Sequence, residues 1–210
     1  MQRRIGLTGG ISTGKSTVAD YLAREYGLPV FDADQAARQA VVVGSPVWER
    51  VRDRYGEAII LPDGEINRRR LGEIVFSDPA ELRWLEGEIH PVVGDRLAQT
   101  LTAWADAPTV VLMIPLLFEA NMTGLVTEIW VVACDEVQQQ QRLIERDRLT
   151  APQAQARIDQ QMPLGKKIVA ADQVLQNTGT LADLYGQIDQ ALTLGAKNFS
   201  PPPKPKNPPF

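Results

Sequence analysis

The sequence predicts an α/β fold in which about five parallel strands form a sheet covered by helices. Short apolar runs alternate with longer segments whose apolar residues recur every three or four positions, which is typical of buried strands alternating with amphipathic helices. A glycine-rich loop directly follows the first apolar run. The runs expected to be strands are Ile5–Thr8, Pro29–Phe31, Thr109–Ile114, Ile129–Cys134 and Gln173–Leu175.

The size of the chain allows one substantial hydrophobic core. It has 210 residues, of which 44% are hydrophobic, so we expect a single unit over residues 1–199 rather than two large independent domains. The formal net charge of −4 and the pI near 5.1 argue against a general nucleic-acid-binding protein, which needs basic surface to neutralise phosphates. Oligomeric state is left open by the sequence.

Nothing in the sequence predicts a membrane span or a disulfide framework. The longest apolar run, Val110–Phe118, is far shorter than the roughly 20 residues needed to cross a bilayer. The N-terminus reaches the glycine-rich loop before an apolar signal region could form. Cys134 is the single cysteine and lies in an apolar run, which favours a small buried hydrophobe over a nucleophile. We therefore expect a cytoplasmic protein.

The long helical stretch between the second and third strands is more than one βαβ connection needs. We interpret it as a helical substrate-binding insertion, and the polar helices after the fourth strand as a mobile lid. The proline-rich end has few apolar groups and is expected to be disordered, so its deletion should change neither activity nor melting temperature. The expected parts are a core (about 1–34, 108–136 and 171–195), a substrate lobe (about 35–107), a lid (about 137–170) and a tail (200–210).

The glycine-rich loop has the pattern of a phosphate-binding loop. Residues 9–16 read G-G-I-S-T-G-K-S and fit G-x-x-x-x-G-K-[ST] between a predicted strand and a predicted helix. Such a loop turns consecutive N–H groups toward phosphate oxygens, the lysine reaches the β- and γ-phosphates, and the serine hydroxyl binds Mg²⁺. We therefore expect an ATP and Mg²⁺ site formed by Gly10, Ile11, Ser12, Thr13, Gly14, Lys15, Ser16 and Thr17.

Two carboxylates follow the second predicted strand. Because the carboxyl ends of parallel strands share one edge of a sheet, Asp32 and Asp34 should lie near the phosphate loop, together with Pro115 and Glu119. In phosphoryl transfer a positioned carboxylate suffices to orient the acceptor hydroxyl, and we assign Asp32 to that role. The alternative is that one or both aspartates cap the helix expected to begin near Gln35, and for Asp34 the two interpretations are balanced.

Arg142 and Arg146 are spaced i,i+4 on one predicted helix, where like charges destabilise unless an anion lies between them. A transferring phosphoryl group would supply that anion, and arginine forks match its oxygens. The alternative is a solvated helix face neutralised by Glu145 and Asp147. Weaker candidates of the same kind are Arg157, Lys166 and Lys167.

His90 is the single histidine, and it precedes Pro91, which should bend its helix. A structural hydrogen bond is favoured for His90 over substrate contact. One histidine and one distant cysteine cannot form a zinc site, so the Mg²⁺ that accompanies a nucleotide is the single metal implied.

Several spaced motifs together resemble the dephospho-CoA kinase family. They cover residues from about 3 to 192, leaving the tail outside the resemblance. The resemblance implies a P-loop kinase fold and ATP-dependent phosphorylation of the ribose 3′-hydroxyl of dephospho-CoA, the last step of coenzyme A synthesis. The motifs are Gly6-Leu7-Thr8-Gly9-Gly10, Gly14-Lys15-Ser16, Asp32-Ala33-Asp34 with Arg38, His90-Pro91, Pro115-Leu116-Leu117-Phe118-Glu119, Arg142 with Arg146-Asp147, and Gln161-Met162-Pro163.

The resemblance also implies roles for single residues. Asp32 would act on the attacking hydroxyl, and Asn177 would lie on the adenine side of the ATP site. The residues it implies for catalysis are Asp32, Lys15, Arg142 and Arg146, and those for substrate binding are Asp34, Arg38, His90, Leu116 and Glu119. This sequence departs from the family pattern at Ser12-Thr13, where Gly-Ser is usual. If position 12 needs a positive φ, serine strains the loop by about 1 kcal/mol.

Two other functions are alternatives to dephospho-CoA phosphorylation. Another small-molecule or nucleotide kinase would use the same loop, carboxylate and arginines, so the acceptor rests on the family resemblance. A nucleotide-responsive binding protein of the GTPase type would show an N-K-x-D signature, which Gln176-Asn177-Thr178-Gly179 does not match.

Overall fold

The computed structural model describes residues 2–195. The proline-rich segment 200–210, with the expected effect of its deletion, lies outside the described residues. The strands are β1 (Arg3–Gly9), β2 (Val30–Asp32), β3 (Thr109–Met113), β4 (Glu128–Ala133) and β5 (Gln173–Gln176). The helices are α1 (Lys15–Tyr26), α2 (Ala33–Ala40), α3 (Pro46–Tyr55), η1 (Glu57–Ile59), α4 (Arg68–Ser77), α5 (Pro79–Ala103), η2 (Thr123–Leu125), α6 (Glu136–Asp147), α7 (Ala151–Asp159), α8 (Leu164–Val169) and α9 (Leu181–Gly195).

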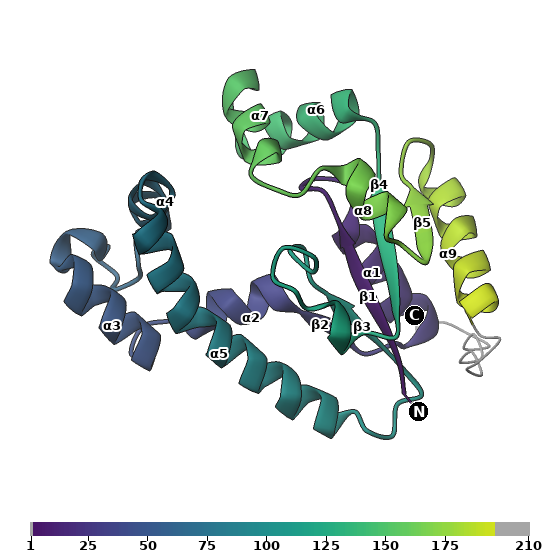
Figure 1. Cartoon of the computed structure of the whole chain (residues 1–210), viewed down its shortest axis with the longest axis horizontal. Helices are drawn as coiled ribbons and strands as arrows, with labels where there is room; N and C mark the ends of the chain where they lie inside the picture. The colour runs from purple at the N-terminus through teal and green to yellow at the C-terminus, as the bar shows by residue number, and fades with distance from the viewer. Residues whose placement is uncertain (1, 196–210) are drawn as a thin grey trace. The chain divides into compact units, whose positions relative to one another are not determined.

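The strands form one parallel sheet in the order β2-β3-β1-β4-β5. This confirms the predicted five-stranded parallel fold, and each strand overlaps the apolar run that predicted it. Because β1 is central, the loop that follows it emerges at the middle of the carboxyl edge of the sheet. Figure 1 shows this arrangement of β1 between β3 and β4.

The main hydrophobic core lies between the sheet and helices α1 and α9 (Figure 1). Alternate residues of the strands point into it, including the fully buried Leu7 and Trp130. From the helices, Leu22 of α1 and Leu184 of α9 are also fully buried. Full burial of an aliphatic side chain contributes about 1.5–3 kcal/mol, so this core anchors the first turn of α1 against the sheet.

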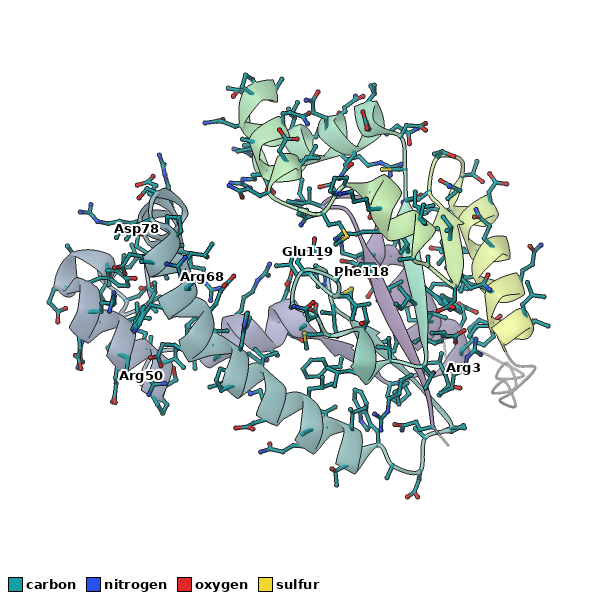
Figure 2. The ribbon with its side chains drawn as sticks, viewed as in Figure 1. Arg3, Arg50, Arg68, Asp78, Phe118 and Glu119 are labelled. Atoms are coloured by element: carbon teal, nitrogen blue, oxygen red, sulfur yellow. The ribbon has the colours of Figure 1, made fainter. Side chains whose placement is uncertain are left out.

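Arg3 at the start of β1 is buried and ties that strand to its neighbours (Figure 2). Its Nε donates to Glu128 Oε1 at 2.5 Å, and its Nη1 donates to the Leu192 carbonyl at 3.1 Å. The guanidinium also lies 5.9 Å from the centre of the Trp130 ring. These contacts compensate the burial of the charge and join β1, β4 and α9.

The chain divides into two compact units. Among the described residues, one unit comprises residues 2–32 and 104–195 and contains the sheet, and the other comprises residues 33–103. The expected division into core, lobe and lid stays a prediction. No helix in residues 2–195 is both long and apolar enough to span a membrane.

The second unit is helical and has its own core, to which Val47, Val51 and Ile59 contribute buried side chains. Helix α3 begins as its sequence predicts, with Pro46 in the first turn and Ser45 as N-cap accepting from the Trp48 amide. Helix α5 continues through Pro91 to Ala103.

An ionic cluster joins α3 and α5 within the second unit. Arg54 donates two hydrogen bonds to Glu81, at 2.7 and 2.8 Å, and the Tyr55 hydroxyl donates to the same carboxylate at 2.6 Å. The guanidinium of Arg54 also lies 4.4 Å from the centre of the Trp84 ring. The bonds from Arg54 and then Tyr55 lower the pKa of Glu81 from 4.5 to about 2.

This cluster predicts an acid-sensitive contribution to stability. Because the folded pKa of Glu81 is depressed, its contribution is present above pH 4.5 and is lost as the pH falls toward about 2. We expect Glu81→Gln to lower the melting temperature at pH 7 and to flatten its fall between pH 4.5 and pH 2, measured by circular dichroism. Glu73→Gln is the control, since Glu73 pairs with Arg69 on the exposed face of α4. Equal pH profiles for the wild type and Glu81→Gln would contradict this assignment.

Candidate nucleotide-binding site

The loop between β1 and α1 has the backbone of an anion cradle. Ser12 adopts φ +59°, and Gly14, the N-cap residue of α1, adopts φ +102°. Position 12 therefore has the left-handed conformation that a glycine would adopt without strain, and serine there costs about 1 kcal/mol. The loop ends at the first turn of α1, where free N–H groups and the helix dipole favour an anion.

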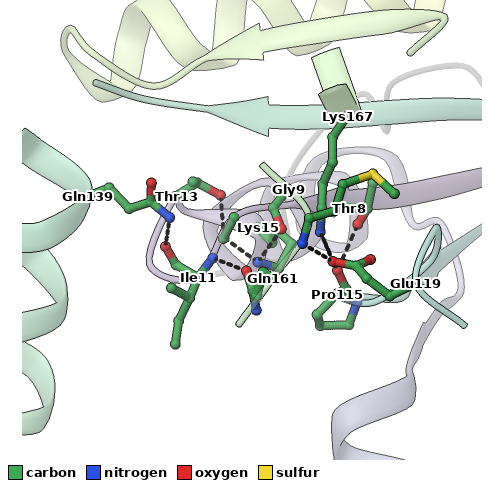
Figure 3. A network of polar contacts seen from close by, with 12 residues as sticks. Thr8, Gly9, Ile11, Thr13, Lys15, Pro115, Glu119, Gln139, Gln161 and Lys167 are labelled. Atoms are coloured by element: carbon green, nitrogen blue, oxygen red, sulfur yellow. Dashed lines mark hydrogen bonds and ion pairs between the residues drawn. The ribbon is translucent and has the colours of Figure 1, made fainter. Parts of the chain in front are cut away.

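Lys15 occupies the first position of α1, and its side chain turns back over the loop. Its ammonium donates to the Gly10 carbonyl at 2.7 Å and to the Gly9 carbonyl at 3.4 Å (Figure 3). Thr13 Oγ1 donates to the same Gly10 carbonyl at 2.9 Å. The ammonium is therefore held at the mouth of the cradle.

Side-chain amides from three other segments form hydrogen bonds with the loop, and Figure 3 shows two of them, those of Gln139 and Gln161. The Ile11 amide donates to Gln161 Oε1 at 2.8 Å, and the Ile11 carbonyl accepts from Gln139 Nε2 at 2.9 Å. Asn177, after β5, donates from Nδ2 to the Thr13 carbonyl at 2.9 Å. The place of Asn177 on the adenine side of the ATP site stays a prediction, and its amide contacts the phosphate loop itself.

A second polar network lies beside the first, on the loop that follows β3. Glu119 accepts from the Lys167 ammonium at 2.9 Å and from the Met162 amide at 2.9 Å (Figure 3). Lys167 is fully buried and also donates to the Pro115 carbonyl, as does Thr8 Oγ1 of β1. Burial alone would raise the pKa of Glu119, but the bonds from Lys167 and Met162 outweigh it and lower the pKa below 4.5.

The two arginines of α6 have different surroundings. Arg142 donates from Nη2 to the Asn177 carbonyl at 3.1 Å, while its Nη1 is buried with no hydrogen-bond partner among residues 2–195. Arg146 is half exposed and pairs with Asp147 at 2.8 Å, and Arg157 pairs with the same carboxylate at 2.6 Å. Arg146 is therefore neutralised by Asp147, as expected for a solvated helix face. Arg142 instead has a buried donor without a hydrogen-bond partner among residues 2–195, and it contacts Asn177.

Asp32 is the last residue of β2 and lies on the same sheet edge as the cradle. Met113 of β3 is in register with Asp32 on one side and with Leu7 of β1 on the other. Two strand spacings of about 4.8 Å each therefore separate Asp32 from the strand that enters the phosphate loop. Leu116, another expected substrate contact, is exposed on the loop after β3.

The remaining expected substrate residues belong to the second unit. Helix α2 begins at Ala33, two residues before the expected start near Gln35. Asp34 therefore lies in the first turn, where a carboxylate interacts favourably with the helix dipole, and Arg38 lies in the last turn. His90 is exposed on α5, and no hydrogen bond of its ring is found within residues 2–195, so the structural bond favoured for it is not supported.

No group of three or more His, Cys, Asp or Glu side chains among residues 2–195 could hold a metal ion. Ser16, in the first turn of α1, is exposed, and its hydroxyl follows directly after the lysine at the mouth of the cradle. Cys134 is buried as expected, and burial raises the pKa of its thiol.

Sequence reasoning missed the contacts of Gln139 and Gln161 with Ile11 and the buried ion pair of Lys167. These residues lie 128, 150 and 48 positions from their partners, so no local spacing connects them. Gln161 is part of the family motif Gln161-Met162-Pro163, but that motif does not indicate which residue its side chain contacts.

The chain resembles characterised proteins over most of its length. Residues 3–183 match the family model described as dephospho-CoA kinase. A curated dephospho-CoA kinase of Trichormus variabilis is 56% identical over 191 residues, covering 91% of this chain and 97% of the relative. The dephospho-CoA kinase of Thermosynechococcus vestitus is 53% identical and covers 91% of this chain and 94% of the relative.

Solved structures share the fold. The crystal structure of TT1252 from Thermus thermophilus superposes with a TM-score of 0.81 at 36% identity, covering 92% of this chain and 97% of the other. A dephospho-CoA kinase from Campylobacter jejuni gives a TM-score of 0.69 at 24% identity, covering 94% and 99%. A shikimate kinase from Acinetobacter baumannii gives 0.55 at 15% identity, covering 94% and 95%. The last two likenesses concern the fold of a P-loop kinase.

Proposed function

The chain belongs to the dephospho-CoA kinase family, and from this premise we propose that it transfers the γ-phosphoryl group of ATP to the ribose 3′-hydroxyl of dephospho-CoA. The observation that carries the proposal is the cradle between β1 and α1, with Lys15 at its mouth and a carboxylate at the end of β2 on the same sheet edge. These are the parts that a phosphoryl transfer to an alcohol needs.

The loop binds the triphosphate of ATP. The backbone N–H groups of residues 12 and 14–17 donate to the phosphate oxygens, while that of Thr13 donates to the Gly10 carbonyl. Lys15 exchanges its carbonyl partners for β- and γ-phosphate oxygens. The Ser16 hydroxyl would hold Mg²⁺. When bound, Mg²⁺ neutralises charge on the β- and γ-phosphates. The Ser12 strain is modest beside these contacts, so the departure at position 12 leaves ATP binding in place.

Asp32 orients the acceptor. Its carboxylate accepts a hydrogen bond from the 3′-hydroxyl and aims the oxygen lone pair at the γ-phosphorus. The proton passes to this carboxylate late, because the transition state is loose and bond formation to the acceptor lags behind bond cleavage to ADP. Asp34, Arg38, His90, Leu116 and Glu119 remain candidates for contact with the rest of dephospho-CoA.

Arg142 stabilises the charge that develops on the transferring group. Its Nη1 is buried without a hydrogen-bond partner among the described residues, and a phosphate oxygen would satisfy this donor. Arg146 must first leave Asp147 to take part, which makes Arg142 the stronger contributor of the two.

The acceptor is tested by offering several alcohols to one enzyme preparation. ADP release in the presence of ATP and Mg²⁺ is measured by a coupled assay with dephospho-CoA, adenosine, AMP and pantothenate in parallel. We expect turnover with dephospho-CoA to exceed that with the others by about 100-fold or more, since each lacks recognition groups that dephospho-CoA offers. Turnover with adenosine or pantothenate but not with dephospho-CoA would identify another small-molecule kinase. The cytoplasmic location and the absence of nucleic-acid partners stay predictions.

A further inference from the structure

The peptide unit on each side of Ile11 forms a hydrogen bond with the side chain of a glutamine from outside the loop. Gln161 Oε1 accepts from the Ile11 amide at 2.8 Å, and Gln139 Nε2 donates to the Ile11 carbonyl at 2.9 Å. We propose that Gln139 and Gln161 are positioning residues that hold the phosphate loop in its ATP-binding shape. This proposal rests on the function proposed above and adds residues to which no role has been assigned.

The backbone fixes the orientation of both side-chain amides. An N–H can only donate and a carbonyl can only accept, so Gln161 must present its oxygen to Ile11 and Gln139 its nitrogen. The two glutamines therefore have opposite requirements: position 161 needs an acceptor and position 139 needs a donor. We call this pair of glutamines the clamp. Its opposite hydrogen-bonding requirements distinguish it from side chains that only fill space beside the loop.

Both glutamines are themselves held in place. Gln139 lies on α6 with 3% of its surface exposed. Gln161 is followed by Met162, whose amide donates to Glu119, and Glu119 is paired with the fully buried Lys167. The acceptor on Gln161 is therefore fixed through its own backbone to the loop after β3 (Figure 3).

The clamp acts next to the strained residue of the loop. Ser12 follows Ile11 and holds φ +59°, a left-handed conformation that strains a residue other than glycine. The two hydrogen bonds to Ile11 stabilise the adjoining peptide units against this strain. Without them Ser12 relaxes toward negative φ, and the amides that follow turn away from the phosphate positions.

The first test removes the acceptor. Calorimetric titration of Gln161→Ala with ATP and Mg²⁺ should show about five- to tenfold weaker binding, which corresponds to one lost hydrogen bond. KM for ATP should rise by a similar factor while KM for dephospho-CoA and kcat stay within about twofold. Gln160→Ala is the matched control, since Gln160 is the exposed neighbour. ATP affinity of Gln161→Ala within about twofold of the control would overturn the proposal.

The second test uses one substitution with opposite expectations. Glutamate at position 161 keeps an acceptor for the Ile11 amide, whereas glutamate at position 139 sets an acceptor against the Ile11 carbonyl. Without nucleotide, Gln161→Glu should melt like the wild type and Gln139→Glu should melt earlier, with Gln190→Glu as an exposed control on α9. A melting temperature lowered equally by Gln139→Glu and Gln161→Glu would contradict the clamp.

The two proposals fail in different ways. ATP titration needs no acceptor, so it reports on the clamp whether or not dephospho-CoA is phosphorylated. A wild-type protein that binds ATP, loses affinity in Gln161→Ala and leaves dephospho-CoA unchanged would retain the clamp and overturn the proposed function.

Discussion

Asp32→Asn is expected to lower kcat by about 100-fold or more while leaving the affinity for ATP nearly unchanged. Asparagine keeps the size of the side chain and its place at the end of β2 but cannot accept the proton of the acceptor hydroxyl. The triphosphate contacts come from the loop after β1, two strands away in the sheet, so ATP binding should not depend on this carboxylate. The measurement pairs steady-state kinetics with dephospho-CoA and calorimetric titration with ATP.

Asp20→Asn is the control for that experiment. Asp20 is exposed on α1, in the same unit as Asp32 and outside the cradle, and its substitution should change neither kcat nor ATP affinity. An unchanged kcat in Asp32→Asn would remove Asp32 from its catalytic role. A large loss of ATP affinity would instead place Asp32 in the nucleotide site.

Gly9→Ala should disrupt the cradle at its entrance. A Cβ on Gly9 would lie 2.3 Å from the Val132 carbonyl oxygen and 2.9 Å from Thr13 Oγ1, at a backbone φ of +148°. The carbonyl belongs to β4, which cannot move without breaking the register in which Gly9 pairs with Val132. We expect the free energy of unfolding to fall by about 3 kcal/mol or more and ATP binding to fall below detection. Urea unfolding and ATP titration measure the two effects.

Gly27→Ala separates backbone strain from steric overlap. Gly27 ends α1 at φ +64°, and a Cβ there meets nothing within 4 Å. Its substitution should cost about 1 kcal/mol of stability and leave ATP binding intact. If Gly9→Ala lowered the free energy of unfolding and ATP binding no more than Gly27→Ala, the close approach of β1 to β4 at Gly9 would not determine the conformation of the loop.

The strands and the phosphate loop could be predicted because each has a local physical signature. Buried parallel strands such as Thr109–Met113 appear as short continuous apolar runs, since both faces are covered. The loop is indicated by glycines and a lysine at fixed spacing, and it lies where the strand-to-helix context places it. The conditional expectation of a positive φ at position 12 is confirmed by the Ser12 backbone.

The supports of the site could not be predicted in the same way. The hydrogen bond from Gln139 to the Ile11 carbonyl depends on how α6 packs beside the loop that follows β1. The two residues are 128 positions apart, so no sequence periodicity indicates the contact. Helix α2 starts at Ala33, two residues earlier than the sequence predicts, because Asp34 belongs to its first turn instead of preceding it. The sequence leaves open whether Arg146 pairs with Asp147 or with a phosphate, because the answer depends on side-chain geometry.

The most direct test of the account is the identity of the phosphorylated product. Wild-type protein with ATP, Mg²⁺ and dephospho-CoA should yield ADP and coenzyme A in equal amounts, with the new phosphomonoester on the ribose 3′ position by phosphorus NMR and mass spectrometry. ADP accompanied by inorganic phosphate and unchanged dephospho-CoA, or phosphate on another hydroxyl, would contradict the claim that this loop and Asp32 direct the γ-phosphoryl group to that oxygen.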